Sequence, residues 1–390
     1  MIIKEATRLG SVQEYYFSGK NRQIAAMNLN GEKVINLGIG SPDLKPSDET
    51  IDVLYAIAQK DDTHGYQPYR GDSALRQEIA TWYADTFKVA CLPDEEVLPL
   101  AGSKEGIMHI SMAFINQGDE VLVPDPGYPT YSSATLLAGG KVRNYKLKES
   151  LAWQIDFEEL EAQDLSKVKI MWTCFPNMPT GARATDETYL RLIALAKKNS
   201  FLIVNDNPYS LVLNTEYKSI LYYPGGFDVA VELNSLSKSH NMAGWRVGWM
   251  LGRKAYIDAV VKFKSNMDSG IFLGIQRAAV EALQNAPEWH LKRNETYSLR
   301  RKLAEQLAKR LNLSFDESQV GLFLWCKIPD SVESGEAVSD ILLEKARVFI
   351  TPGFVFGSTG ERYVRISLCT HHDNYMEAIR RLDKAKIEFK

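Results

Sequence analysis

The chain has 390 residues, which is enough for two or three domains of ordinary size. Its hydrophobic residues (45%) and charged residues (24%) are in the proportions of a globular protein and exclude a disordered or fibrous chain. The formal net charge of −3 gives no reason to expect nucleic acid or an anionic membrane as a partner.

No apolar run approaches the roughly 18 residues that a membrane-spanning helix needs, so we expect no membrane association. Residues 1–8 hold no apolar stretch of the kind found in secretion signals. The four cysteines show no paired spacing, which argues against a disulfide scaffold or structural zinc and fits a reducing cytosol. From these features together we expect a cytoplasmic protein. His371 and His372 are adjacent rather than at the spacing of metal ligands, so we expect no metal site.

Short apolar runs alternate with longer amphipathic segments between about residues 97 and 252. Each short run is bounded by Gly, Pro, Asn or Asp, as is typical of buried strands. The segments 103–116 and 187–199 have helical periodicity. This alternation predicts an α/β fold with a doubly wound, mostly parallel sheet. The expected strands are 97–101, 120–123, 141–145, 168–175, 201–205, 229–234 and 247–251.

The pattern changes after Pro287. Leucines at steps of four residues predict one long helix over 288–311. Beyond it, strands 322–328 and 363–368 flank a helix over 337–345, and a last helix covers 372–387, which together indicate a smaller α+β unit. The first forty residues fit neither sheet clearly and are assigned to this smaller unit. We therefore expect a large α/β domain over 48–286 and a small α+β domain formed by 1–47 and 287–390.

Ligands of open α/β sheets bind beyond the carboxyl ends of the strands, so the loops after the strands are the places to search for chemistry. The first such loop is Ala101-Gly102-Ser103-Lys104, between an expected strand and an expected helix. Glycine allows a tight turn, and the free N–H groups at the start of the helix form an anion site. A phosphate site and a plain capped helix start have the same pattern here.

The second loop, Asn205-Asp206-Asn207-Pro208-Tyr209, places a carboxylate at the end of a buried strand. Such a carboxylate is costly unless it meets a cation or several hydrogen-bond donors. A helix or turn cap is the alternative interpretation of Asp206.

The third loop, Ser235-Leu236-Ser237-Lys238-Ser239-His240, surrounds a lysine with small hydroxyl side chains and no acidic neighbour. A buried lysine readily loses its proton and forms Schiff bases, although most lysines are simply solvated. Eight residues later, Arg246 is able to hold a phosphate with two parallel hydrogen bonds.

The fourth segment is the strand Tyr363-Val364-Arg365-Ile366-Ser367-Leu368. Strand alternation places Tyr363, Arg365 and Ser367 on one face, with Arg365 pointing into solvent or into a carboxylate site. A phosphate nest, a carboxylate, a reactive lysine and an arginine together suit pyridoxal 5′-phosphate, which binds to a lysine as a Schiff base and needs an acidic partner for its pyridinium nitrogen.

With these motifs in this order, the chain resembles the class I/II aminotransferases of the aspartate-aminotransferase fold, known as fold type I of the pyridoxal-phosphate enzymes. The resemblance runs from about Gly38 to Ser367 and is greatest to the branch of LL-diaminopimelate and methionine or aromatic aminotransferases. It implies a large doubly wound α/β domain with a smaller α+β domain. It also implies transfer of an amino group between an L-amino acid and a 2-oxo acid.

The resemblance implies a role for each matching residue around the cofactor. Lys238 would form the Schiff base, Asp206 would pair with the pyridine nitrogen, and Tyr209 would bond the phenolic oxygen of the ring. Tyr128, in Pro126-Gly127-Tyr128-Pro129, takes the place of the aromatic side chain that stacks on the ring. The residues implied around the phosphate are Ser103, Lys104, Ser235, Ser237 and Arg246.

Further positions match residues of the family that contact the substrate or the neighbouring subunit. Gly40, in Gly38-Ile39-Gly40-Ser41, and Arg365 match the positions that hold the substrate α-carboxylate. Tyr66, in Tyr66-Gln67-Pro68-Tyr69, matches the tyrosine that reaches the phosphate of the partner, which implies a homodimer with composite active sites. Side-chain selectivity is expected from Tyr15 or Tyr16, from residues 266–272 and from residues near Tyr66 of the partner. Their aromatic rings favour large neutral side chains, and aspartate stays open as an alternative donor.

One departure from the family pattern affects the cofactor ring. The family usually has Asn directly before Pro-Thr-Gly, where it bonds the ring oxygen. Here the run is Pro176-Asn177-Met178-Pro179-Thr180-Gly181, so Met178 stands at that position. Two outcomes are open: Asn177 replaces the missing amide after a local shift of the backbone, or the hydrogen bond to the ring oxygen is lost.

Three other functions compete with the aminotransferase interpretation. The same scaffold serves C–S β-lyases, which would release pyruvate and ammonia from cystathionine or cysteine, and the loops alone do not exclude them. A regulator with a fused DNA-binding module is disfavoured by the short N-terminal segment and by the charge. A nicotinamide-dependent dehydrogenase is disfavoured because Gly38-Ile39-Gly40 is followed by Asp43 where a third glycine should stand.

Overall fold

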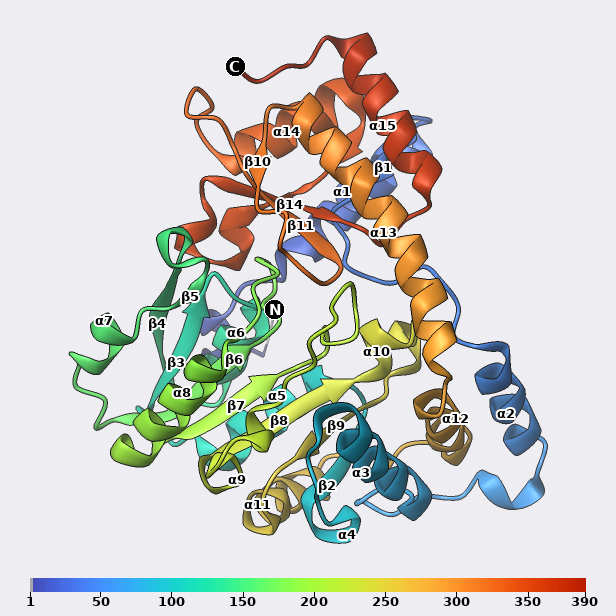
Figure 1. Ribbon diagram of the computed structural model, residues 1–390, viewed down its shortest axis with the longest axis vertical. Helices are drawn as coiled ribbons and strands as arrows, with labels where there is room; N and C mark the ends of the chain where they lie inside the picture. Colours follow the sequence, from blue (N-terminus) through green and yellow to red (C-terminus); the bar gives the residue numbers. More distant parts are fainter. Residues whose placement is uncertain (1–2) are drawn as a thin grey trace.

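A computed structural model describes residues 3–390, and residues 1–2 of the predicted small domain lie outside the described part of the chain. Eight strands form the larger sheet, in the order β2-β9-β8-β7-β6-β3-β4-β5 (Figure 1). The strands β8, β7, β6, β3 and β4 run parallel, whereas β9 is antiparallel to both of its neighbours and β5 is antiparallel to β4. The strand bounds are β2 (Val97–Leu100), β3 (Glu120–Asp125), β4 (Lys141–Lys148), β5 (Gln154–Ile155), β6 (Val168–Cys174), β7 (Leu202–Asp206), β8 (Ala230–Ser235) and β9 (Gly248–Leu251). The predicted α/β fold with a mostly parallel sheet is confirmed.

Helices cover both faces of this sheet because its strands are apolar on both sides. Along β6, Ile170 and Trp172 pack in one hydrophobic cluster and Met171 packs in the other, as strand alternation requires. The first cluster includes residues of α5 (Ser103–Phe114), α6 (Pro129–Leu137) and α11 (Lys254–Lys264). The second includes residues of α3 (Ser73–Phe87), α8 (Asp186–Asn199) and α12 (Leu273–Leu283). Shorter or peripheral helices are α2 (Asp48–Ala58), α4 (Pro93–Glu96), α7 (Phe157–Glu161), α9 (Gly226–Val229) and α10 (Leu236–Ser239).

The C-terminal part of the chain builds a second, antiparallel sheet in the order β10-β11-β14-β13, drawn in orange and red above the large sheet in Figure 1. The long helix expected over 288–311 is α13, and the expected final helix is α15. The elements of this part are α13 (Pro287–Arg310), β10 (Ser314–Phe315), β11 (Phe323–Lys327), α14 (Gly335–Ala346), β12 (Val348–Phe349), β13 (Thr351–Pro352), β14 (Tyr363–Ser367) and α15 (His372–Ala385).

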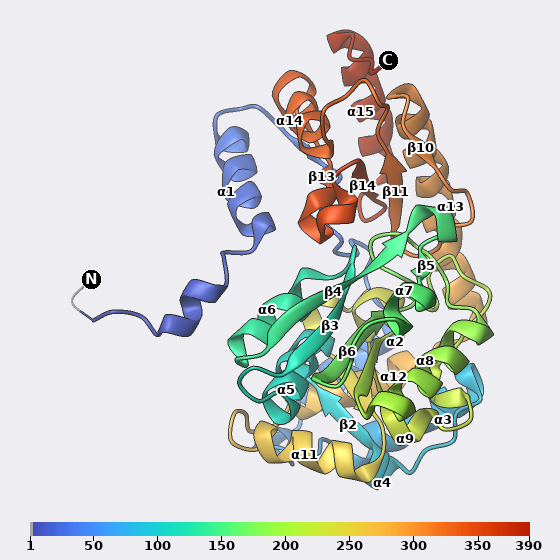
Figure 2. The same cartoon turned by 90° about the vertical axis from the view of Figure 1, so that its left-hand side faces the viewer.

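The N-terminal segment is tied to this second unit by a strand pair and by apolar contacts. Strand β1 (Ile35–Asn36) pairs in parallel with β12. Helix α1 (Tyr16–Leu29) lies beside α14, as Figure 2 shows, and buries Ile24 against Leu343 and Phe349. The exact domain boundaries, at 47/48 and 286/287, remain a prediction.

Within residues 3–390, no helix combines the length and the apolar character that crossing a membrane would require.

Candidate active site

A cavity of about 440 Å³ lies where the loops after the large-sheet strands meet the second sheet. Its walls come from residues far apart in the sequence, including α5, the ends of β7 and β8, and strands β11 and β14. It brings together most of the residues predicted for the site. These are Tyr15, Gly40, Ser103, Lys104, Tyr128, Asp206, Tyr209, Ser235, Ser237, Lys238, Arg246 and Arg365.

Lys238 reaches the cavity from α10, the short helix that directly follows β8. Its Nζ donates a hydrogen bond to the carbonyl oxygen of Gly40 at 2.5 Å. Burial lowers the pKa of this amine, and the cationic groups of Arg365 and Arg246 act in the same direction. Lowering the pKa increases the neutral fraction, and only the neutral amine acts as a nucleophile or base.

Asp206 is the last residue of β7, and its side chain is 5% exposed. One carboxylate oxygen, Oδ2, accepts a hydrogen bond from the hydroxyl of Tyr131 at 2.9 Å, whereas Oδ1 is buried without a partner. Burial raises the pKa of Asp206 to about 7, with the carboxylate of Glu232 adding to the shift. The unpaired Oδ1 fits a cationic N–H group such as a protonated pyridine nitrogen, which would supply both the missing hydrogen bond and the missing charge.

Aromatic side chains form the wall next to Asp206. Tyr131 stacks on Trp172 with ring centroids 5.0 Å apart and planes at 4°. Tyr128, one turn earlier at the start of α6, meets Tyr131 edge to face at 5.6 Å. Tyr209, three residues after Asp206, is buried, and its ring lies 5.9 Å from that of Phe323. The cavity therefore has flat apolar walls around one carboxylate, as a planar heteroaromatic ring requires.

A candidate anion site lies where α5 begins. Gly102 precedes the helix with a φ of 89°, and Ser103 is the first helical residue. A side chain on Gly102 would collide with the guanidinium of Arg246, which donates to the carbonyl of Ala101 at 3.2 Å. Three serines and two cationic residues also line the cavity: Ser103, Ser235, Ser237, Lys104 and Arg246. This set of donors fits a phosphate group.

Arg365, on β14, is a buried cation without a carboxylate partner among residues 3–390. It donates to the carbonyl of Gly38 at 2.8 Å and lies 3.3 Å from the thioether sulfur of Met178. Its guanidinium carbon lies 3.9 Å from the ring centroid of Phe323 and 4.5 Å from that of Phe356. Burial lowers its pKa to about 10, which leaves the group charged at neutral pH. An unpaired cation facing a cavity fits the carboxylate of a substrate.

Two pairs of neighbouring residues lie differently with respect to the cavity, and the roles predicted for Asn177 and Tyr15 stay predictions. Met178 lines the cavity and Asn177 does not. The side-chain oxygen of Asn177 instead accepts hydrogen bonds from the backbone and hydroxyl of Thr180, at 3.2 and 2.9 Å. The side-chain Nδ2 of Asn177 is buried without a hydrogen-bond partner among the described residues. Tyr15 lines the cavity, whereas Tyr16 packs against Phe354 outside it.

Tyr66 does not line the cavity of its own chain, and its side chain is 93% exposed. This position agrees with the inter-subunit role implied by the family resemblance, which stays a prediction.

Several residues of the cavity were not anticipated from the sequence. Tyr131 had a recognisable signal, because it stands one helical turn after Tyr128. Phe323 and Phe356, which cover Arg365, had none, because they lie in ordinary apolar segments of the second unit. The remaining lining residues not anticipated are Phe17, Asn21, Ile39, Ser41, Cys174, Pro208 and Ala243.

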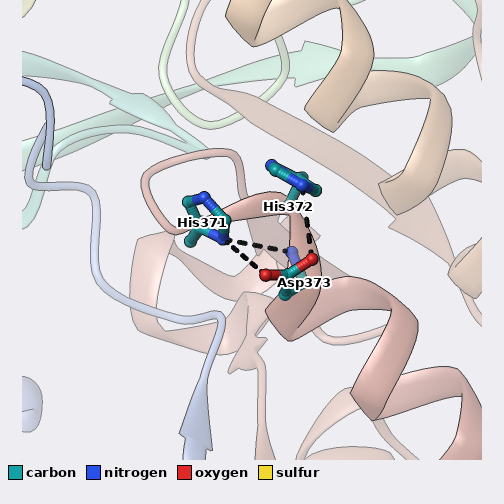
Figure 3. Close-up of side chains that lie close together, drawn as sticks. All are labelled: His371, His372 and Asp373. Carbon is teal, nitrogen blue, oxygen red and sulfur yellow. Dashed lines mark hydrogen bonds and ion pairs between the residues drawn. The ribbon is translucent and has the colours of Figure 1, made fainter.

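Two groups of potential metal ligands occur in the described part of the chain. Figure 3 shows His371 and His372 directed toward Asp373, with nitrogen–oxygen distances of 3.1 and 3.2 Å. The sequence spacing argued against a metal site here, yet the ligand atoms are close together. His371 and Asp373 are exposed, His372 is partly exposed, and the group lies at the positive N-terminus of α15. In the second group, Glu105, His109 and Asp268, the ammonium of Lys264 already pairs with Asp268. Neither group has the surroundings that favour a bound cation.

Comparison with protein families gives a match over residues 32–382 to the family described as aminotransferase class I and II. Among individual relatives, an LL-diaminopimelate aminotransferase from Halothermothrix orenii is 38% identical over 390 residues, covering 100% of both chains. An LL-diaminopimelate aminotransferase from Maridesulfovibrio salexigens is 39% identical over 384 residues, covering 98% of this chain and 99% of the relative.

Solved structures give the same result at the level of the fold. The substrate-bound structure of BacF from Bacillus subtilis superposes with a TM-score of 0.95 at 31% identity, covering 100% of this chain and 99% of that one. An aspartate aminotransferase from Thermotoga maritima superposes with a TM-score of 0.89 at 30% identity, covering 97% and 99%. The predicted aspartate-aminotransferase fold is confirmed by these likenesses.

Proposed function

The chain belongs to the class I and II aminotransferases, and from this premise we propose that it moves an amino group between an L-amino acid and a 2-oxo acid with pyridoxal 5′-phosphate held at Lys238. The family resemblance inferred from the sequence and the prediction of an aminotransferase are both confirmed at the level of the family. The relatives described above are named for amino-group transfer, which favours this function over the C–S β-lyase alternative.

The observation that carries the proposal is the placement of Lys238, Asp206 and Arg365 around one cavity. When bound, pyridoxal 5′-phosphate supplies an aldehyde that condenses with amines and a ring that accepts electron density. Asp206 would hold the ring nitrogen through its free Oδ1, and Tyr209 would hold the phenolic oxygen. The phosphate would lie against the start of α5, held by Ser103, Lys104, Ser235, Ser237 and Arg246.

The chain's own residues account for substrate binding and for the proton transfer. Arg365 binds the α-carboxylate with its planar guanidinium, and Phe323 and Phe356 exclude water from this ion pair. Fixing the carboxylate orients the α-carbon toward Lys238, whose neutral Nζ removes the α-proton as general base. Asp206, kept ionised by the opposite charge it binds, holds the positive charge of the ring nitrogen in place.

The test is the visible absorption spectrum of the purified protein supplied with pyridoxal 5′-phosphate. We expect a cofactor band that disappears when a suitable amino acid is added without an oxo acid, and that returns when a 2-oxo acid follows. Release of pyruvate and ammonia from cystathionine or cysteine, with a band that persists, would instead establish the β-lyase. Absence of any band with excess cofactor would overturn the proposal.

We also propose that the enzyme is a homodimer in which Tyr66 completes the phosphate site of the partner subunit. Support comes from the family resemblance and from the 93% exposure of this tyrosine in the single chain. A two-fold dimer is also the commonest assembly of soluble proteins. An active monomer in sedimentation experiments would refute this assembly.

For the donor, we propose an L-amino acid with a long side chain, and LL-diaminopimelate is the first candidate because both relatives described above are named for it. The aromatic walls from Tyr15 and Phe17 also suit methionine, phenylalanine or tyrosine. Comparing kcat/KM for these amino acids and for aspartate, with one common oxo acid, decides between them.

The four cysteines form no disulfide, which supports a cytoplasmic location for the enzyme as part of the same proposal.

A further inference from the structure

Glu232, on β8, is a fully buried carboxylate for which the described residues supply hydrogen bonds but no cation. Its Oε1 accepts from the hydroxyl of Tyr83 at 3.0 Å and from Nδ2 of Asn207 at 3.3 Å. Its Oε2 accepts from Nδ2 of Asn205 at 2.8 Å and from the backbone N–H of Ile220 at 3.3 Å. None of the catalytic roles proposed above uses this residue.

Four hydrogen bonds reach the carboxylate of Glu232 and each comes from a donor, as an ionised carboxylate requires. Burial raises the pKa of Glu232, and the hydrogen bonds from its polar neighbours, including the hydroxyl of Ser219, act in the opposite direction. The backbone N–H of Ile220 is a donor by its chemistry. The oxygen of Tyr83 already receives a hydrogen bond from Nδ2 of Asn234 at 3.3 Å, so its proton is directed at Glu232. The geometry therefore corresponds to an ionised carboxylate.

The two asparagines that Glu232 binds stand on either side of Asp206 in the sequence. In the parallel register of β7 and β8, Asn205 lies opposite Glu232 and Asp206 lies opposite Leu233. Asn205 also accepts a hydrogen bond from Thr173 on β6 at 2.9 Å, and Asn207 also donates to the carbonyl of Lys218 at 3.0 Å. One carboxylate thus fixes both neighbours of Asp206 from the opposite face of the sheet.

We propose that Glu232 is a positioning residue that holds Asp206 in its orientation and adds a second negative charge behind it, so that the nitrogen of the cofactor ring stays protonated. This inference rests on the proposed function. A buried ion without a counter-ion is costly, and a well-packed apolar group would give the fold more stability. A cation bound at Asp206 would act as counter-ion for both carboxylates and so offset the free-energy cost of burying Glu232.

The experiment compares the wild-type enzyme with Glu232→Gln, each reconstituted with pyridoxal 5′-phosphate labelled with ¹⁵N in the ring. Expected results for Glu232→Gln are a ring-nitrogen NMR signal shifted toward the deprotonated position and a cofactor Kd raised about tenfold. Ser339→Ala is the matched control, because it removes a buried hydrogen bond to Ile350 remote from the cavity. It should lower Tm and leave both readouts unchanged.

An unchanged nitrogen signal and Kd in folded Glu232→Gln would overturn the inference, even if Tm falls. If Glu232→Gln does not fold, Asn207→Ala removes one of the two asparagine contacts and leaves three donors on Glu232. Its Kd should then rise about threefold, and an unchanged Kd would again overturn the inference. A wild-type protein that binds no cofactor would instead refute the proposed function itself.

Discussion

At the scale of single residues, the site is built from groups that a folded chain normally avoids burying. Asp206, Lys238 and Arg365 each have a pKa shifted by burial toward their neutral form, and none of them has an oppositely charged partner in contact. Side chains that have shifted pKa values and that line the same cavity are typical of catalytic sites. Under the proposed function, Asp206 would pair with the ring nitrogen of the cofactor, Lys238 with its aldehyde, and Arg365 with the carboxylate of the substrate.

Replacing Lys238 with Ala should abolish turnover, because the variant lacks both the Schiff-base amine and the general base. The far-UV circular dichroism spectrum should be unchanged, which separates loss of chemistry from loss of fold. Multiple turnovers of the variant in a coupled assay of oxo-acid formation would contradict the role of this lysine.

Replacing Asp206 with Asn should stabilise the cofactor-free protein above pH 7 and weaken cofactor binding. The pKa of Asp206 is raised from 3.8 to about 7, so the stability contributed by its protonated form is present below about pH 4 and is lost as the pH rises through about 7. At pH 8 the ionised carboxylate, which forms no ion pair within residues 3–390, lowers the free energy of unfolding by about 4 kcal/mol, and Asn removes this loss.

Thermal unfolding of the cofactor-free proteins at pH 5 and pH 8 checks the Asp206→Asn prediction. The gain in Tm should be larger at pH 8, and cofactor titration of the same samples should show weaker binding. A variant that is less stable than the parent at pH 8 would disprove the assignment of an unpaired buried carboxylate.

Replacing Arg365 with Lys should raise KM about tenfold or more for every amino-acid substrate, with a smaller effect on kcat. Lysine keeps the charge but lacks the planar fork that binds a carboxylate with two hydrogen bonds. Arg301→Lys is the control, because Arg301 is also buried but bonds the backbone of Gln319 outside the cavity. An unchanged KM in Arg365→Lys would mean that the carboxylate binds elsewhere.

At the scale of elements, the chemistry lies where strands end and helices begin. The turn between β2 and α5 has room only for glycine at position 102. Gly102 has a positive φ, and a side chain there would collide with Arg246. Gly118 has nearly the same φ, 90° against 89°, but faces open space. Comparing substitutions at these two glycines therefore separates the effect of the positive φ from the effect of the close approach to Arg246, the residue proposed to bind the phosphate.

Gly102→Ala and Gly118→Ala should each lose about 1 kcal/mol of stability from the positive φ. Only Gly102→Ala should also lose cofactor affinity, about tenfold or more, because the new methyl group displaces Arg246. Equal cofactor Kd values for the two variants would show that the turn does not shape the phosphate site.

The sequence predicted the long elements well, because their signals are local. The seven expected strands of the large sheet and the helix over 288–311 all occur, with bounds that differ by a few residues. Strands β1 and β12 were not predicted, because two-residue strands carry no periodic pattern and exist only through pairing across more than 300 residues of chain. For the same reason, the antiparallel direction of β9 was not visible in its sequence.

Residues of the candidate site could be predicted from the sequence where a charged or reactive side chain stands among apolar or small ones. Lys238, Asp206 and Arg365 stood out as charged residues in apolar or small surroundings. The partners that make them effective did not stand out: Tyr131, Phe323 and Glu232 are ordinary residues of helices or strands until the fold places them. Long-range packing, which no local pattern encodes, determines these contacts.

At the scale of the whole molecule, the prediction of composite sites has a quantitative test. Tyr66→Ala and Lys238→Ala homodimers should each lack activity, for different reasons. When the two variants are co-expressed, a mixed dimer regains one complete site, so random pairing should restore about a quarter of the parental activity. No recovery in a mixture shown to contain mixed dimers would place each active site within one subunit.

The carbonyl groups of residues 38–40 accept hydrogen bonds from two side chains of the cavity and from one beside it. Arg365 donates to Gly38, Ser367 donates to Ile39, and Lys238 donates to Gly40. Under the proposed function, substrate and cofactor compete with this backbone for the nitrogen atoms of Arg365 and Lys238. Occupation of the site therefore releases a segment that joins the N-terminal region to the rest of the enzyme, and amide exchange there should speed up on binding, opposite to the protection ligands usually give.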